Sequence, residues 1–227
     1  MKITNNPFTL IAIPREGDQL GDFLDRYAQV ICERVLRSLD LTSDERQSLI
    51  SDEFELSQQF NKGAWIYDDG NPEDFCNLGF GLLNLAEVEA AHLKAHILGL
   101  GFSGLFHIFE RQVIMVLKRL DFRRRGDVWG SVPKNKRHTF SGYKDALKYG
   151  GYPISGDVHT KVELLRLVAN IMKHGSASSL QSLHKKFPQM FWPGGDILSI
   201  DMIRLTPELL LESANVVAKY WREFPHA

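Results

Sequence analysis

The segment 157–174 carries three polar side chains that fall on one face of a predicted helix. Arg166, Asn170 and His174 follow each other at intervals of four residues, so each lies about one helical turn from the next. Guanidinium groups bind anions and imidazoles exchange protons near neutral pH, which makes this face a candidate site. The alternative is an ordinary solvent face, in which His174 lies favourably at the helix C-terminus and Gly175 ends the helix.

A second polar group interrupts the apolar pattern of the segment 104–120. Glu110 lies at the edge of the apolar arc of this predicted helix, where a carboxylate needs a partner. His107, Arg111 and Lys118 fall on an adjacent stripe, so an imidazole, a carboxylate and a guanidinium surround one helical turn. One interpretation is a functional site; the other is a buried Glu–His or Glu–Arg pair that ties two helices together.

A known pattern joins the segments LFHIFERQVIMVLKR and, some sixty residues later, ELLRLVANIMKHGSASSLQSL. Asn170, Lys173, His174 and Gly175 form the sequence NxxKHG at the end of the predicted helix. The combination resembles the helical HEPN superfamily, whose members bind nucleotides or cleave RNA in bacterial toxin and phage-defence systems. The resemblance covers roughly residues 80–220.

The late helix of that family carries an Arg, often followed by a polar residue such as Asn, and a His after four to six intervening positions. In this chain Ala169 precedes Asn170, and seven residues separate Arg166 from His174. Three alternatives follow. Arg166 reaches one position further along the stripe, Arg111 from the other helix supplies the cation, or the site is degenerate.

The resemblance implies a metal-independent endoribonuclease that acts as a toxin or phage-defence effector. His174 would exchange the proton of the ribose 2′-OH, and Arg166 or Arg111 would stabilise the charge on the phosphorane. Asn170 would orient the phosphate or the imidazole, and Glu110 would hold the neighbouring His107 or an arginine. The alternative is a non-catalytic nucleotide-binding, RNA-binding or protein-interaction module on the same fold.

The segment 118–138 is strongly basic. It contains eight Lys and Arg residues against two Asp, and Phe122 and Trp129 lie between them. Cations interleaved with aromatic rings are typical of a single-stranded RNA track, because bases stack on the rings and phosphates pair with the cations. The alternative is a solvated loop that pairs with the acidic segment 40–74. The predicted RNA-binding residues are Arg123, Arg124, Arg125, Lys134, Lys136, Arg137 and Lys173.

A metal site is not expected. Glu89, His92 and His96 share one helical face, but a di-metal carboxylate site needs a second Glu-x-x-His and two further Glu on facing helices. No spacing in the chain supplies those ligands, and no glycine-rich phosphate loop precedes a helix. We therefore predict neither a metal nor a cofactor.

The elements that position these residues are predicted to be mainly helical, which indicates an all-α, HEPN-like helical bundle. Three glycines, Gly99, Gly101 and Gly104, either divide the longest helical pattern into two helices or mark close packing. The predicted helices span about 21–39, 75–120, 141–148, 157–174, a short segment ending near 186, and 206–223, with a further N-cap at Thr42 or Ser43. Short strands or extended arms are expected at 3–13 and 197–205.

The domain organisation follows from the same pattern. No repeat or flexible linker divides the chain, so we predict a single helical domain over 1–227. Its expected parts are N-terminal helices with an acidic excursion (1–75) and a HEPN-like core (76–227) with an inserted basic loop (121–156).

Composition limits the classes of protein. The 227 residues include 27 Lys and Arg against 28 Asp and Glu, which excludes attachment to nucleic acid or membrane through overall basicity. Two cysteines and an N-terminus without signal-peptide features indicate a cytoplasmic protein. The apolar stretch 97–109 is too short for a membrane span and predicts a buried helix. We expect RNA or a nucleotide, an antitoxin or defence protein and a second copy of the chain as partners, and no membrane.

Overall fold

The fold of the described chain is helical. The computed structural model describes residues 14–51, 72–123, 127–137, 139–154, 156–193 and 199–224. All elements named within these ranges are helices, and the β-type pairing they contain is an isolated antiparallel bridge between Phe191 and Ile203. The prediction of an all-α protein is confirmed, whereas the HEPN-like arrangement of the helices stays a prediction.

The chain divides into two compact units. One unit comprises residues 1–32 and 98–227, and the other comprises residues 33–97. The single domain over 1–227, with its parts 1–75 and 76–227, stays a prediction. All candidate residues of the predicted active site belong to the first unit.

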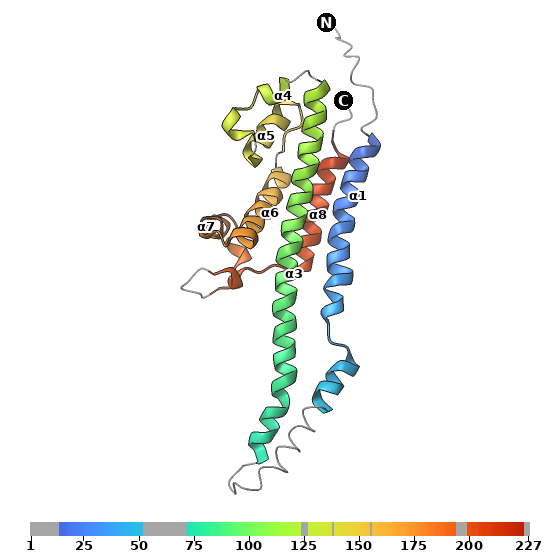
Figure 1. Cartoon of the computed structure of the whole chain (residues 1–227), viewed down its shortest axis with the longest axis vertical. Helices are drawn as coiled ribbons and strands as arrows, with labels where there is room; N and C mark the ends of the chain where they lie inside the picture. Colours follow the sequence, from blue (N-terminus) through green and yellow to red (C-terminus); the bar gives the residue numbers. More distant parts are fainter. Residues whose placement is uncertain are drawn as a thin grey trace. The chain divides into compact units, whose positions relative to one another are not determined.

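The first unit is built on a close contact between its terminal helices, α1 (Pro14–Val30) and α8 (Pro207–Arg222), which lie side by side in Figure 1. An added Cβ at Gly17 would collide with the carbonyl oxygen of Trp221, and one at Gly21 would lie 3.0 Å from that of Ala218. The two backbones therefore approach each other at these glycines, where any side chain would force them apart.

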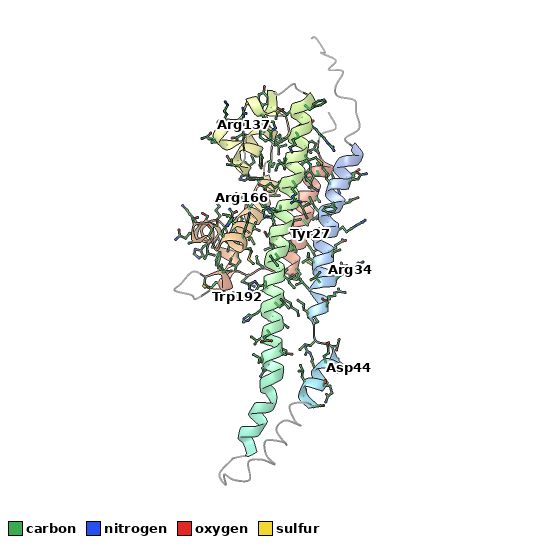
Figure 2. All side chains as sticks on the ribbon, viewed as in Figure 1. Tyr27, Arg34, Asp44, Arg137, Arg166 and Trp192 are labelled. Atoms are coloured by element: carbon green, nitrogen blue, oxygen red, sulfur yellow. The ribbon has the colours of Figure 1, made fainter. Side chains whose placement is uncertain are left out.

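The longest helix, α3, runs without interruption from Pro72 to Arg123. The predicted division at its glycines is wrong, and the alternative of close packing is confirmed. A Cβ at Gly99 would collide with the end of the Met172 side chain of α6. A Cβ at Gly104 would collide with the hydroxyl of Tyr27 of α1, which is labelled in Figure 2.

The region 121–156 was predicted as a loop with one helix at about 141–148, and α5 (Phe140–Tyr149) confirms that helix. The described residues of the region also contain α4 (Asp127–Gly130), which was not predicted. Both helices lie beside the C-terminal end of α3 in Figure 1. Asp121 of α3 accepts a hydrogen bond from the backbone N–H of Trp129 at 2.9 Å, and the Trp129 ring packs edge-on against Tyr143, with 6.0 Å between centroids. These tertiary contacts hold α4 and α5 in place, although the many glycines and prolines of the segment indicated an irregular structure.

The helices that follow agree closely with the predictions. α6 spans Gly156–His174 and ends at Gly175, whose φ of 58° is the left-handed conformation that favours glycine. α7 spans Ala177–Lys186. α8 begins at Pro207, where the Thr206 hydroxyl accepts a hydrogen bond from the Leu209 N–H at 3.2 Å.

The predicted strand or arm at 197–205 is corrected. The described part of this segment contains a 3₁₀ turn at Ile200–Met202, followed by the single bridge of Ile203 to Phe191. The Trp192 N–H donates to the Met202 carbonyl oxygen at 3.0 Å. The turn interrupts the extended backbone, so the pairing does not extend into a strand. The predicted arm at 3–13 lies outside the described residues.

The N-terminal helix also differs from its prediction of 21–39. It begins at Pro14, because proline is tolerated in the first helical turn, where its missing N–H is not needed. After Val30 the chain continues as a π-helical turn, Ile31–Val35, and a 3₁₀ turn, Arg37–Leu39.

The second unit contains a helix at residues 43–51 and the N-terminal part of α3. Thr42 and Glu45 form a capping box: the Thr42 N–H donates to Glu45 Oε2 at 2.8 Å, and the Glu45 N–H donates to Thr42 Oγ1 at 3.2 Å. This confirms one of the two predicted N-caps. Inside this unit Lys94 pairs with Asp40.

The segment Asn84–Phe122 of α3 is long and apolar enough to cross a membrane by length and composition. Half of its most apolar stretch is buried inside the protein, and core helices of soluble proteins share this property. Phe102, Leu105 and Phe109 are fully buried, so the part predicted as a buried helix is one. The segment is weak support for a membrane contact.

Candidate functional site

The polar stripe of α6 is tied to α7 by an ion-pair network. The Arg166 guanidinium donates two hydrogen bonds to the Glu163 carboxylate, at 2.8 Å from Nε and 3.0 Å from Nη2. Lys186 of α7 donates to the same carboxylate at 2.7 Å. Lys186 lies 23 residues from Glu163, and no sequence signal indicated this pairing.

The network holds Glu163 in its charged form. Hydrogen bonds from Arg166, opposed by partial burial and assisted by Lys186, lower the pKa of the Glu163 carboxyl from 4.5 to about 2. The same pairing raises the pKa of Arg166 above its usual value. Both Arg166 donors that face Glu163 are therefore occupied, which reduces the capacity of this guanidinium to hold two phosphate oxygens.

The end of α6 presents the NxxKHG residues to solvent. Lys173 and His174 are exposed and Asn170 is half-buried. Within the part of the chain that the structure describes, no hydrogen bond or ion pair joins the His174 imidazole to Asn170 or Arg166. His174 is the last residue of α6, the helix C-terminal position that the alternative interpretation describes.

Ala169 occupies the position where the resemblance places the catalytic arginine, and it lies in the core. Its exposed fraction is 1%, and its neighbours Leu167, Val168 and Ile171 are also buried. A guanidinium at this position would be buried among apolar side chains rather than aligned with His174. The position at which the resemblance places an arginine therefore lies on the buried face of α6, whereas Arg166 and His174 lie on its polar face.

The HIFER turn of α3 forms a loose contact within one helix. His107 Nδ1 and Glu110 Oε2 are 3.5 Å apart, at the limit of a hydrogen bond. Glu110 also approaches α5: burial raises the pKa of the Tyr143 hydroxyl, and the Glu110 charge raises it further. The expected pair between two helices is not formed by His107, because both partners belong to α3, and Arg111 points to solvent without a described partner for its side chain.

The HIFER residues of α3 and the polar stripe of α6 do not contact each other through polar groups in the described part of the chain. Among the described residues, no hydrogen bond or ion pair links the HIFER group of α3 to the stripe of α6. Arg111 therefore shows no contact that would replace Arg166 beside His174. A shared catalytic centre remains a prediction.

The basic segment divides into exposed and engaged residues. Lys134 and Lys136 are exposed in a short 3₁₀ turn, whereas the Arg137 Nε donates to the Val132 carbonyl oxygen at 3.1 Å. Figure 2 shows Arg137 beside α4 and α5, and Arg166 on α6. Arg123 is the last residue of α3, and Arg124 and Arg125 lie outside the described residues.

The two aromatic residues of the basic segment have different environments. Phe122 is 86% exposed, whereas Trp129 packs against Tyr143. The sequence treats both rings as equivalent candidates for base stacking. In the structure Phe122 is the more exposed of the two rings, and Trp129 is partly buried.

A polar contact between α5 and α6 was not predicted. Lys144 Nζ lies 2.7 Å from His159 Nε2, in a partly buried position. An ammonium group only donates, so His159 Nε2 accepts, and any ring proton is on Nδ1. Lys144 and His159 lie 15 positions apart in the sequence, and nothing in the intervening segment indicated this contact.

No metal-binding cluster is formed by the described residues: they contain no group of three or more His, Cys, Asp or Glu side chains that could hold an ion. Glu89, His92 and His96 are each exposed on α3.

Comparison with known proteins adds no relative: no protein-family model matches the chain, and no curated protein or solved structure shows significant similarity to it.

Proposed function

We propose that the chain is a non-cleaving RNA-binding module on an all-helical fold. The observation that carries this proposal is the group of exposed lysines at the α3–α5 end of the first unit: Lys118, Lys134 and Lys136. None of the three forms an ion pair with a described carboxylate, so each is able to neutralise a phosphate.

The α6 stripe supports a binding role rather than a cleaving one. Arg166 is engaged by Glu163, and Ala169 is buried. Cleavage without a metal needs a proton-exchanging group and a cation beside the same phosphate. Because Arg166 is already bound to Glu163, its guanidinium has less capacity to hold a phosphate beside His174.

Fluorescence anisotropy with a labelled single-stranded RNA of about 12 nucleotides tests binding. We expect saturable binding by the full chain, and a roughly tenfold weaker affinity for the double variant Lys134→Gln/Lys136→Gln at low salt. The matched control is Lys185→Gln/Lys219→Gln, which removes the same charge from α7 and α8. Equal affinities for both double variants, or no saturable binding, would contradict the proposal.

The second candidate function is the metal-independent endoribonuclease. One observation favours it: His174 is exposed, and its imidazole has no described partner. Incubation of RNA in excess chelator with the full chain and with His174→Ala separates the two functions. Cleavage that the substitution abolishes would establish the nuclease and overturn the non-cleaving proposal; we expect none in either sample. The toxin or defence role, its protein partner and the homodimer stay predictions.

A further inference from the structure

One face of α3 presents an imidazole, two cationic side chains and, at its end, an aromatic ring. We call His107, Arg111, Lys118 and Phe122 the α3 stripe. At 100° per residue these positions fall within an arc of about 60°, over a length of about 22 Å. Arg111 and Lys118 are exposed, as is 43% of the His107 side chain, and Phe122 is 86% exposed.

The neighbouring helices pack against the faces of α3 on either side of the α3 stripe. Before the stripe begins, Tyr27 of α1 packs against Gly104, which has the same helical angle as Phe122. Phe106 meets Phe140 of α5 with 5.6 Å between ring centroids, and Phe109 meets Trp221 of α8 at 5.7 Å. Gln112 donates to the Leu20 carbonyl oxygen of α1 at 3.1 Å. These three positions lie more than about 100° from the centre of the α3 stripe.

The carboxylates nearest in sequence leave Arg111 and Lys118 without an ion pair among the described residues, although Glu110 contacts His107. Asp121 is engaged by the Trp129 N–H at 2.9 Å, on the side of α3 where α4 lies. Glu110 contacts His107 at 3.5 Å and lies toward Tyr143. Arg111 and Lys118 thus keep their positive charge toward solvent, which complements an anionic partner.

The exposed apolar surface of the α3 stripe is a single ring. Over residues 98–122, the part of α3 in the first unit, the well-exposed large apolar side chains are Leu100 and Phe122, at 62% and 86%. They lie about 33 Å apart along the helix, and Ile114 and Met115 between them are partly buried, so these side chains form no continuous apolar face. Insertion into a membrane surface requires a continuous apolar face, whereas stacking of an unpaired base requires one accessible ring.

We infer that an unpaired nucleic-acid strand binds along the α3 stripe, with a base stacked on Phe122 and phosphates held by Lys118 and Arg111. The inference rests on the proposed RNA-binding function and adds the class of ligand: single-stranded RNA rather than duplex RNA. Bases in a duplex already stack on each other, so only a single strand gains from Phe122.

The test compares two labelled probes, a single-stranded oligouridine RNA of about 12 nucleotides and an RNA duplex of the same length. For Phe122→Ala we expect at least about fivefold weaker binding of the single strand and unchanged binding of the duplex. Arg111→Gln should weaken the binding of the single strand as well. Trp192→Ala is the control, because Trp192 is an exposed aromatic residue, 55% exposed, in the segment between α7 and α8 and not on α3. Thermal unfolding of each variant checks that its fold is unchanged.

The outcomes separate this inference from the proposed function. If Lys134→Gln/Lys136→Gln weakens binding while Phe122→Ala and Arg111→Gln bind the single strand like the unmodified chain, the inference is overturned and the proposed function stands. If neither probe binds the unmodified chain, the proposed function itself fails. Binding to vesicles with anionic lipids, without binding to either RNA, would assign the α3 stripe to a membrane and overturn both.

Discussion

Glu163 is the residue on which the polar stripe of α6 depends. Its carboxylate receives Arg166 from its own helix and Lys186 from α7, at 2.7 to 3.0 Å. A partly buried carboxylate of this kind stabilises the fold only while it is charged and paired. The same pairing withdraws Arg166 from the role that the resemblance assigns to it.

Glu163→Gln should lower stability in a pH-dependent manner. The folded-state pKa of about 2 lies below the usual 4.5, so the pairing contributes fully above about pH 4.5 and is lost as the pH falls toward 2. We expect a deficit of about 1–2 kcal/mol at neutral pH, reduced by solvent near the half-exposed Lys186. Urea unfolding of the unmodified protein and of Glu163→Gln, between neutral pH and about pH 2, measures this deficit. A difference in unfolding free energy that stays constant across that range would refute the stabilising role of the charged Glu163.

Ala169→Arg, which restores the arginine of the family pattern, should destabilise the protein instead of activating it. The side chain would enter the core, and we expect a loss of at least about 3 kcal/mol or a failure to fold. Asn170→Arg, at the adjacent half-buried position, is the control and should cost less than about 1 kcal/mol. Thermal unfolding decides, and an Ala169→Arg protein as stable as the control would show that this face of α6 is not core.

The positions of the helices depend on close contacts at glycines as well as on the burial of apolar side chains. α1 meets α8 where Gly17 and Gly21 leave room for the α8 backbone, and α3 meets α1 and α6 at glycines of its own. Glycines usually weaken a helix, so their presence in α1 and α3 signals close packing rather than helix ends.

Gly17→Ala should separate α1 from α8. The new methyl group would collide with the Trp221 carbonyl oxygen, a backbone atom that cannot rotate away. We expect a loss of about 1–3 kcal/mol in the free energy of unfolding, in spite of the better helix propensity of alanine. Gly130→Ala, whose Cβ would meet no atom within 4 Å, serves as the control. Equal melting temperatures for the two variants would disprove the close contact.

The whole chain has a net charge of −1, yet its charges are unevenly distributed along the sequence. The segment 40–74 has ten acidic residues against two basic ones, and the segment 118–138 has eight basic residues against two acidic ones. The exposed lysines of the basic segment lie in the first unit. Overall neutrality therefore does not oppose local binding of a polyanion.

The affinity for single-stranded RNA should fall with salt concentration, and the steepness of the fall should reflect the number of cations that contact phosphates. With Lys118, Lys134, Lys136 and Arg111 each neutralising a phosphate, the logarithm of the association constant should fall against the logarithm of salt concentration with a slope of about −2 to −3. Anisotropy titrations between about 50 and about 200 mM salt provide the slope. Removing Lys134 and Lys136 should reduce its magnitude by about one; an unchanged slope would exclude these lysines from the interface.

The features that the sequence determined by itself are those with local causes. The end of α6 at Gly175, the start of α8 at Thr206 and Pro207, and the cap at Thr42 each depend on neighbouring backbone groups. Such signals are contained within a few residues, and helical periodicity indicated the buried faces between them.

The candidate site was decided by the tertiary structure. Lys186 reaches Glu163 across 23 residues, Trp129 packs edge-on against Tyr143 while Phe122 is exposed, and Ala169 faces the core. Each outcome depends on which helix packs against which face. Residue spacing reports how side chains are arranged around one helix, but the neighbour that occupies each face is set by contacts between residues far apart in the chain.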